Sequence, residues 1–386
     1  MRASMISAAA VAALVGYGST IALVLSAAAA LGASPAETGS WVFAVCLAKA
    51  IGSAVLSSWT RIPVVLAWST PGAALIAGSV GLTMAQGVGA FLLAAALMVL
   101  TGVIRPLARL IGAIPPSVAA GMLAGVLLPF CLAVPVQAAA MPGLVLPIVA
   151  VFVAVRLWNP AFAVLAALAT GLVLALVSGT GVAGVAASLP ALVFIRPEFS
   201  PAALIGLGVP VYLVTMASQN LPGFAVLRGA GYEPPVQKAL TVTGLFSGIA
   251  ALFGGHMVNM AAITAAICLA DEVEPDRARR WKVGLVYGFF WLLLGLSGPL
   301  LLAGLAAVPP GLVATVVGLA LAAPLIGALG QAFAVVDQRF TATATLVVAT
   351  SGVSAFHIGA AFWGLLAGLA VHLLALAANR LTTRLP

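Results

Sequence analysis

Residues 252–268 read LFGGHMVNMAAITAAIC, and this stretch is the best guide to the fold. It places a histidine, His256, and an asparagine, Asn259, inside a run that is otherwise apolar or small. A helix over residues 257–270 would extend roughly 21 Å at about 1.5 Å per residue, which is too short for a hydrocarbon core of about 30 Å. The two glycines before the histidine favour irregular backbone. We therefore predict a broken membrane segment whose helix begins near the midplane, with His256 and Asn259 in its opening turn.

The composition is that of a polytopic membrane protein. Hydrophobic residues make up 63% of the 386 residues and charged residues 6%, whereas a soluble domain has about 25% charged residues. The mean hydropathy is +1.24. The basic residues behind the net charge of +8 are scattered among short loops, so a nucleic-acid partner is not expected. The three cysteines lack metal-ligand spacing, and neither a metal site nor a cofactor is predicted.

Loop chemistry predicts fourteen membrane segments, which begin near residues 7, 40, 63, 84, 116, 142, 160, 203, 236, 257, 282, 310, 339 and 356. If the N-terminus is cytoplasmic, all of the 16 basic residues except Arg196 and Lys49 fall in cytoplasmic loops, as the positive-inside rule requires. Removing one early segment would scatter them across both sides. We therefore expect a multi-pass protein with both termini in the cytoplasm.

Two pairs of short matches indicate an internal repeat. Residues 114–121 (IPPSVAAG) resemble 308–315 (VPPGLVAT) at an offset of 194, and residues 71–77 (PGAALIA) resemble 259–265 (NMAAITA) at an offset of 188. Seven segments per repeat is an odd number, so the second repeat must be inverted relative to the first. Inverted repeats with paired broken helices are typical of secondary transporters, whose substrate site lies where the breaks meet.

The counterpart of the opening stretch is residues 68–78, WSTPGAALIAG. Ser69 or Thr70 can cap a helix, and Pro71 suits its first turn because its missing N–H costs nothing there. The β-branched run over residues 62–67 predicts an extended segment ahead of this helix. The two helix N-termini would then face one another near the midplane, an arrangement suited to a carboxylate or another anion. The alternative is a pair of kinked helices with ordinary packing.

Other polar residues interrupt apolar segments. Pro222 removes a helical hydrogen bond where Gln219 and Asn220 lie, and these amides either contact substrate or hydrogen-bond between helices. Lys49 lies about 15 Å into the second segment without an intramembrane acidic partner, so it either attracts an anion or is structural. The predicted substrate-binding residues are Tyr17, Ser19, Ser69, Thr70, Pro71, Gly72, Gln219, Asn220, His256, Asn259 and Met260, with ring contacts at Met216, Phe224 and Phe253.

Catalytic motifs are missing from the sequence. It contains no nucleophile elbow, P-loop or metal-binding cluster, so an enzyme is not expected.

At these motifs the chain resembles the bacterial benzoate/proton symporter family. The likeness runs over nearly the whole chain and is most telling at residues 69–75 (STPGAAL), 216–224 (MASQNLPGF) and 254–264 (GGHMVNMAAIT). It implies a bacterial inner-membrane protein with a fold related to the nucleobase/ascorbate transporters. That fold is all-α, with 14 transmembrane segments in two inverted repeats of seven and short strands before the half-helices in segments 3 and 10.

The resemblance also implies a division into domains. A core domain would comprise residues 1–110 (segments 1–4) and 203–305 (segments 8–11). A gate domain would comprise residues 111–180 (segments 5–7) and 306–386 (segments 12–14). Residues 181–202 would form an external linker between the repeats.

The function implied is import of benzoate or a similar aromatic carboxylate together with protons, by alternating access. The nucleobase carriers have carboxylates in segments 8 and 10, where this chain has Gln219 (or Ser218) and His256. Carboxylates would repel an anionic substrate in a low dielectric, so the departure favours an anion. Two other functions stay open, a nucleobase carrier and an anion channel. The oligomeric state stays open between a monomer and a homodimer.

The departure also makes His256 the predicted proton carrier. Its imidazole would be neutral in the empty site and would take up a proton together with the carboxylate. The alternative is that the proton enters elsewhere, for example as benzoic acid.

Overall fold

The computed structural model describes residues 2–104, 106, 114–160, 162–177, 189–299, 308–353, 355 and 358–382. These residues form 14 helical segments, several of them interrupted, so the predicted number of segments is confirmed. The helices of the first half are α1 (Ala3–Gly18), α2 (Ile21–Ala30), α3 (Pro35–Thr60), α4 (Thr70–Ala77), α5 (Met84–Val103), α7 (Pro116–Ala140), α8 (Pro142–Trp158) and α9 (Ala163–Val177). Those of the second half are α10 (Pro201–Ala203), η1 (Leu204–Gly208), α11 (Val209–Thr215), η2 (Met216–Asn220), α12 (Leu221–Gly229), α13 (Val236–Ala251), α14 (Ile263–Leu269), α15 (Lys282–Leu296), α17 (Pro310–Ala332), η3 (Val336–Gln338), α18 (Arg339–Thr350) and α19 (Ala360–Thr382).

The helices are of two kinds by length. In the described part of the chain, 7 helical stretches are long and apolar enough to cross a membrane, and α8, α9 and α15 are apolar but shorter. In contrast, α4 has 8 residues and α14 has 7, so each extends only about 10–12 Å. Each is too short to cross a hydrocarbon core of about 30 Å, and we call these two the half-helices.

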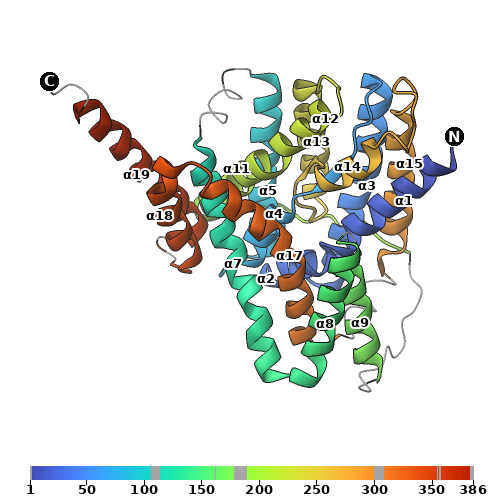
Figure 1. Cartoon of the computed structure of the whole chain (residues 1–386), viewed down its shortest axis with the longest axis horizontal. Helices are drawn as coiled ribbons and strands as arrows, with labels where there is room; N and C mark the ends of the chain where they lie inside the picture. The colour runs from blue at the N-terminus through green and yellow to red at the C-terminus, as the bar shows by residue number, and fades with distance from the viewer. Residues whose placement is uncertain are drawn as a thin grey trace.

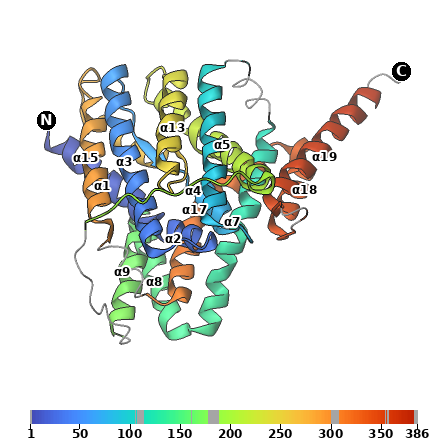
Figure 2. The ribbon, with the colours of Figure 1, turned by 180° about the vertical axis from the view of Figure 1, so that it is seen from behind.

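Eight of the other helices gather in two groups, which are seen from opposite sides in Figures 1 and 2. One bundle contains α3, α5, α13 and α15, in which α5 packs against α13 and α15 packs against α3. The other contains α7, α8, α9 and α17, which extend below the first bundle in Figure 1. Helices α18 and α19 pack against each other and against α7, and they lie far from the N-terminus. Helix α4 packs against α2, α11 and α7, and α14 packs against α1 and α12.

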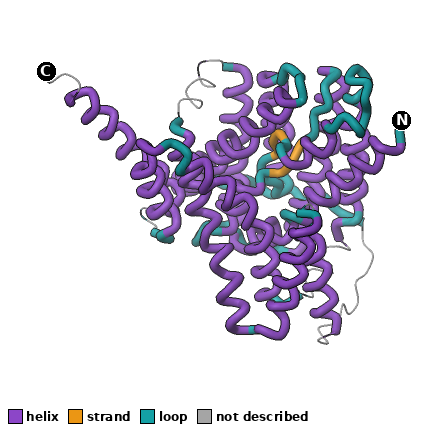
Figure 3. The backbone as a smooth tube through the Cα atoms, viewed as in Figure 1, coloured by secondary structure: helices purple, strands orange, loops and turns teal. Residues whose placement is uncertain are grey.

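A two-stranded sheet joins the starts of the half-helices (Figure 3). Strand β1 (Leu66–Trp68) pairs antiparallel with β2 (Val258–Met260), and Ala67 lies opposite Asn259. Serines on neighbouring helices hydrogen-bond the outer edges, since the N–H of Leu66 donates to Ser53 Oγ (3.1 Å) and that of Val258 donates to Ser247 Oγ (2.9 Å). Backbone polar groups buried in a membrane must have such partners, so the strands are held from both sides.

The second half-helix begins later than predicted. His256 and Asn259 do not lie in its opening turn, because the helix starts at Ile263 and Asn259 is in β2. Gly254 has a φ of +89°, a conformation that glycine adopts without strain, and there the chain turns from α13 toward the strand. The short apolar run is therefore shared between a strand and a helix.

Pro222 has the predicted effect on its helix. The five residues before Leu221, Met216–Asn220, form a π-helix, in which the N–H of Leu221 donates to the carbonyl of Met216. Single π-helical turns widen a helix and re-aim its side chains. As a result, Ser218 and Gln219 line a cavity while Asn220 is fully buried on another face.

Candidate functional site

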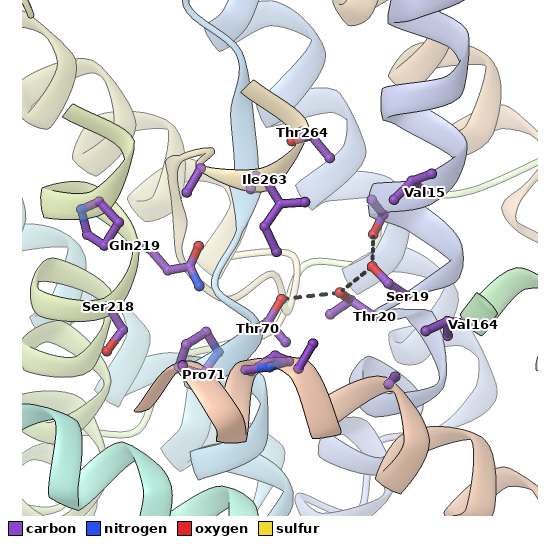
Figure 4. A pocket seen from close by; sticks show the side chains of 18 of the residues that line it. Val15, Ser19, Thr20, Thr70, Pro71, Val164, Ser218, Gln219, Ile263 and Thr264 are labelled. Carbon is purple, nitrogen blue, oxygen red and sulfur yellow. Dashed lines mark hydrogen bonds between the residues drawn. The ribbon is translucent and has the colours of Figure 1, made fainter. Parts of the chain in front are cut away.

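A cavity of about 770 Å³ lies between the half-helices and the second group of long helices. This is the size range of small-molecule sites. Ser19, Thr70, Pro71 and Gln219 line one wall and are drawn in Figure 4. The part of the lining that comes from α7, α8, α9 and α17 is mostly apolar, with side chains that include Leu123, Leu127, Phe152, Val164 and Leu319. We call this space the central cavity.

The start of α4 presents hydroxyl groups to the central cavity. Ser69 is the N-cap and its Oγ accepts from the N–H of Gly72 (3.1 Å), which confirms Ser69 as the cap. Its side chain is fully buried and also hydrogen-bonds Thr215 (2.6 Å). Thr70 faces the cavity and hydrogen-bonds Thr20 (3.2 Å), as Figure 4 shows. Ser69 therefore orders the helix start, and Thr70 is the group that a ligand can reach.

The neighbours of Gln219 fix the orientation of its amide. Asn259 Nδ2 lies 2.8 Å from the carbonyl oxygen of Met260 and 3.4 Å from Gln219 Oε1. A carbonyl oxygen only accepts, so the Asn259 atom beside it must be the NH2 group. That NH2 group then requires an acceptor on Gln219, which turns the Gln219 oxygen toward Asn259. The NH2 group of Gln219 is left as a donor on the side of Thr70 (Figure 4).

Lys49 lies among aromatic rings at the edge of the central cavity. Its ammonium is 2.8 Å from the ring centroid of Trp291 and 4.4 Å from that of Trp68, and Tyr17 packs on both rings. Lys49 is fully buried, and Nζ has no hydrogen-bond partner among the described residues. Cation–π contacts compensate part of the desolvation cost of a cation. We call Lys49, Tyr17, Trp68 and Trp291 the lysine box.

His256 lies behind the sheet and not at the central cavity. It is fully buried, and its Nδ1 accepts a hydrogen bond from Trp41 Nε1 (2.9 Å). An indole N–H can only donate, so a neutral His256 carries its proton on Nε2. This Nε2 has no hydrogen-bond partner in the described part of the chain.

The structure thus separates the predicted site residues into two sets. Those that line the central cavity are Ser19, Lys49, Thr70, Pro71 and Gln219. Those that do not line it are Tyr17, Ser69, Gly72, Asn220, His256, Asn259 and Met260, together with the predicted ring contacts Met216, Phe224 and Phe253. Several of the second set support the first, as Asn259 does when its Nδ2 donates to Gln219 Oε1 (3.4 Å). Direct contact of this second set with substrate stays a prediction.

The central cavity also has polar lining residues that the sequence did not single out. They are Thr264 and Tyr287 near α14, and Arg156, Asn159 and Gln331 at the ends of α8 and α17. Thr264 lies within the opening stretch, so the sequence contained a signal for it. Tyr287, Asn159 and Gln331 stand alone in apolar or loop sequence, and Arg156 appeared only as one more basic loop residue.

All formal charge in the cavity lining is positive. Lys49 on α3 and Arg156 on α8 contribute it. The chain has 8 acidic residues, all of which the structure describes, and none of them lines the cavity. The lining therefore suits an anion with an apolar body.

Comparisons with known proteins agree with a transport protein. A family model described as "Benzoate membrane transport protein" matches residues 1–374. The inner membrane protein YdcO of Escherichia coli (strain K12) is 40% identical over 357 residues, which cover 92% of this chain and 91% of that protein. The benzoate membrane transport protein of Acinetobacter baylyi is 28% identical over 365 residues, which cover 94% of this chain and 93% of that protein.

Solved structures resemble the fold. The transmembrane domain of the cyanobacterial bicarbonate transporter BicA matches with a TM-score of 0.62 at 14% identity, covering 95% of this chain and 98% of that one. SLC26A9 matches with a TM-score of 0.61 at 12% identity, covering 97% of this chain and 66% of that one. At such identities the likeness concerns the fold alone.

Proposed function

The chain belongs to the benzoate membrane transport family, whose members are membrane transporters and not enzymes, and from this premise we propose that it imports benzoate or a similar aromatic carboxylate. Import would be coupled to protons and would proceed by alternating access across the bacterial inner membrane. The protein would have its N- and C-termini in the cytoplasm.

The observation that carries this proposal is the charge of the central cavity. Lys49 and Arg156 are its charged lining residues, and no carboxylate accompanies them. A buried cation without a partner is costly in a membrane, and an anionic substrate would reduce that cost. A neutral base would not, so the lining favours a carboxylate over a nucleobase.

We place the carboxylate between the start of α4 and Gln219. There the hydroxyl of Thr70 and the NH2 group of Gln219 are donors, and a helix N-terminus favours negative charge. The ring would lie against the apolar wall formed by α7, α8, α9 and α17. Tyr17, Ser69, Gly72, Asn220, Asn259 and Met260 would hold this arrangement from behind.

Symmetric support of the strands favours two inverted repeats of seven segments. Ser53 and Ser247 are 194 residues apart, which is the offset of the Pro-Pro matches. Each accepts a hydrogen bond from a strand N–H, Ser53 from β1 and Ser247 from β2. Helices α3 and α15 are segments 2 and 11, and α13 and α5 are segments 9 and 4. The packing of α15 on α3 therefore has its counterpart in the packing of α13 on α5 when the two repeats are exchanged.

The same packing favours two domains that move relative to each other. We assign residues 1–110 and 203–305 to a core domain that carries the half-helices, and residues 111–180 and 306–386 to a gate domain. Residues 181–202 would link the repeats outside. The central cavity has lining residues from both domains, as a carrier by alternating access needs.

We assign the coupled proton to His256. It is a fully buried base whose Nε2 has no partner among the described residues. Because Nδ1 accepts the hydrogen bond from Trp41, the neutral imidazole can take a second proton there only if that hydrogen bond breaks or the ring rotates. Such a change would tie protonation to movement around the sheet.

Counterflow in proteoliposomes tests the substrate class. Vesicles loaded with unlabelled benzoate should take up external labelled benzoate faster than vesicles loaded with buffer alone. Protein-free liposomes provide the blank. Competition by uracil or xanthine but not by benzoate would select a nucleobase carrier. Currents that follow the anion potential without counterflow would select an anion channel.

A further inference from the structure

Arg156 is a second cation at the central cavity, in a place that differs from the anion site proposed above. It lies in the last turn of α8, whereas Lys49 is on α3 and the half-helices are α4 and α14. Its side chain is half-buried, and its guanidinium carbon is 6.0 Å from the ring centroid of Phe152. A positive charge therefore lies in a mostly apolar part of the cavity lining.

The described residues give Arg156 no ion partner. The salt bridges found there join other residues, and the cavity lining contains no acidic side chain. A guanidinium presents several N–H donors in a planar fork that matches a carboxylate. Gln331, near the end of α17, lines the same region and adds an amide.

Of the two cavities, only the central cavity has charged lining residues. A second cavity of about 760 Å³ is lined by the end of α2, the start of α3, residues 189–193 and the start of α17. None of its lining residues is charged. In the orientation given by the positive-inside pattern, this second cavity faces outward, whereas the ends of α8 and α17 face the cytoplasm.

We propose that Arg156 forms a second carboxylate site at the cytoplasmic mouth of the central cavity, on the gate domain. This inference rests on the proposed transport of an aromatic carboxylate. The site receives the anion as it leaves the half-helices and lowers the barrier to release into the cytoplasm. Because a carrier works in both directions, the same site captures substrate that approaches from the cytoplasm.

The test compares the two faces of the membrane. Inside-out and right-side-out vesicles expose the cytoplasmic and outer faces, and the initial rate of labelled benzoate uptake is measured on each at equal pH on both sides. For Arg156→Gln, the half-saturating benzoate concentration should rise about tenfold at the cytoplasmic face, as for loss of one charge-assisted contact. It should stay unchanged at the outer face, and Arg156→Lys should restore part of the loss.

The matched control is Arg228→Gln. Arg228 is also in the last turn of a helix, α12, but it is exposed and does not line the cavity, so both faces should behave as in the wild type. Rising KCl should weaken benzoate uptake at the cytoplasmic face in the wild type but not in Arg156→Gln, because salt screens exposed charges.

The outcomes separate this inference from the function on which it rests. Wild-type vesicles without saturable benzoate uptake would overturn both. Saturable uptake with equal half-saturation for wild type and Arg156→Gln would overturn the second site alone. If Arg156→Gln does not fold, wild-type uptake that ignores KCl at the cytoplasmic face overturns it.

Discussion

Lys49 shows most directly how a single residue links the sequence to the proposed function. A lysine at this depth cannot extend to water easily, and the aromatic rings of the lysine box replace only part of its hydration. Its Nζ has no hydrogen-bond acceptor among the described residues. Groups that are costly to bury and yet lie at a cavity are usually functional, so we expect Lys49 to oppose stability and to favour anion binding.

Lys49→Met should therefore separate affinity from stability. Benzoate affinity should fall at least about tenfold, because a charge-assisted interaction of about 1.5–3 kcal/mol is lost. The thermal midpoint in detergent should not fall, because a buried ammonium whose desolvation is only partly compensated is replaced by an apolar chain of similar length. Binding by calorimetry and unfolding by fluorimetry measure the two effects.

Lys238→Met is the control for that experiment. Lys238 also stacks on a tryptophan, with Nζ 4.6 Å from the ring centroid of Trp59, but it is exposed on α13 and lines no part of the cavity. Its replacement should leave benzoate affinity unchanged. Unchanged affinity in Lys49→Met, together with a lower thermal midpoint, would show that the lysine is structural.

His256→Gln should remove proton coupling while preserving the fold. Glutamine cannot titrate, but its Oε1 can accept the hydrogen bond that Trp41 donates to His256. We expect benzoate binding that no longer varies with pH and loss of the proton-driven component of uptake. His372→Gln, on α19, is the control and should behave like the wild type. If His256→Gln keeps the proton dependence of the wild type, the coupled proton is carried by Lys49 or by benzoic acid itself and not by His256.

Only part of the site could be foreseen at the residue scale. Thr70 and Gln219 were found because a helix cap and a proline mark their surroundings, and both line the cavity. His256 and Asn259 were found because polar residues are rare in this chain, but rarity does not tell which way a side chain points. Side chains alternate between the two faces of β2, so the strand itself decides which of them reach the cavity. Asn259 does not line the cavity but hydrogen-bonds Gln219, which does.

At the scale of elements, the half-helices depend on how their first residues are fixed. Ser69 has two roles, because its Oγ caps α4 and also hydrogen-bonds Thr215 on the neighbouring α11. A Cβ atom on Gly72 would lie 2.8 Å from that Oγ, so only glycine fits beside the intact cap. The cap therefore determines both where α4 begins and how it meets the π-helical segment.

Ser69→Ala should destabilise the protein and weaken benzoate binding together. Loss of an N-cap costs about 1 kcal/mol, and the buried Thr215 hydroxyl loses its partner as well. Ser69→Thr, which keeps the oxygen, should restore most of the thermal midpoint and of the affinity. Ser79→Ala is the matched control, because Ser79 bonds only the carbonyl of Ile76 near the other end of α4. Equal effects of Ser69→Ala and Ser79→Ala would show that the Ser69 cap contributes nothing specific to stability or to benzoate binding.

The elements themselves could be predicted better than their ends. Proline and capping residues mark the start of α4, and Pro222 marks the interruption in its helix, as the structure has them. The start of α14 was misplaced because its N-cap, Ala262, makes no side-chain hydrogen bond. Nothing in the sequence separates the residues of β2 from those of the helix that follows.

At the scale of the whole molecule, composition and loop charge were sufficient for the membrane class and the number of segments. Hydrophobicity and basic loops act over the entire chain, so local errors average out. The second wall of the central cavity could not be foreseen, because α7, α8, α9 and α17 meet the half-helices only through tertiary packing. Arg156 belongs to that wall, which explains why its place emerged only from the structure.

Saturable benzoate uptake into proteoliposomes under an imposed inward proton gradient tests the central claim most directly. Neutral benzoic acid crosses bilayers unaided, so uptake into protein-free liposomes under the same gradient must be subtracted at every concentration. The remaining initial rate should saturate with benzoate, should be inhibited by excess unlabelled benzoate, and should increase with the proton gradient. A remaining rate that neither saturates nor responds to the gradient would contradict proton-coupled transport of an aromatic carboxylate by this protein.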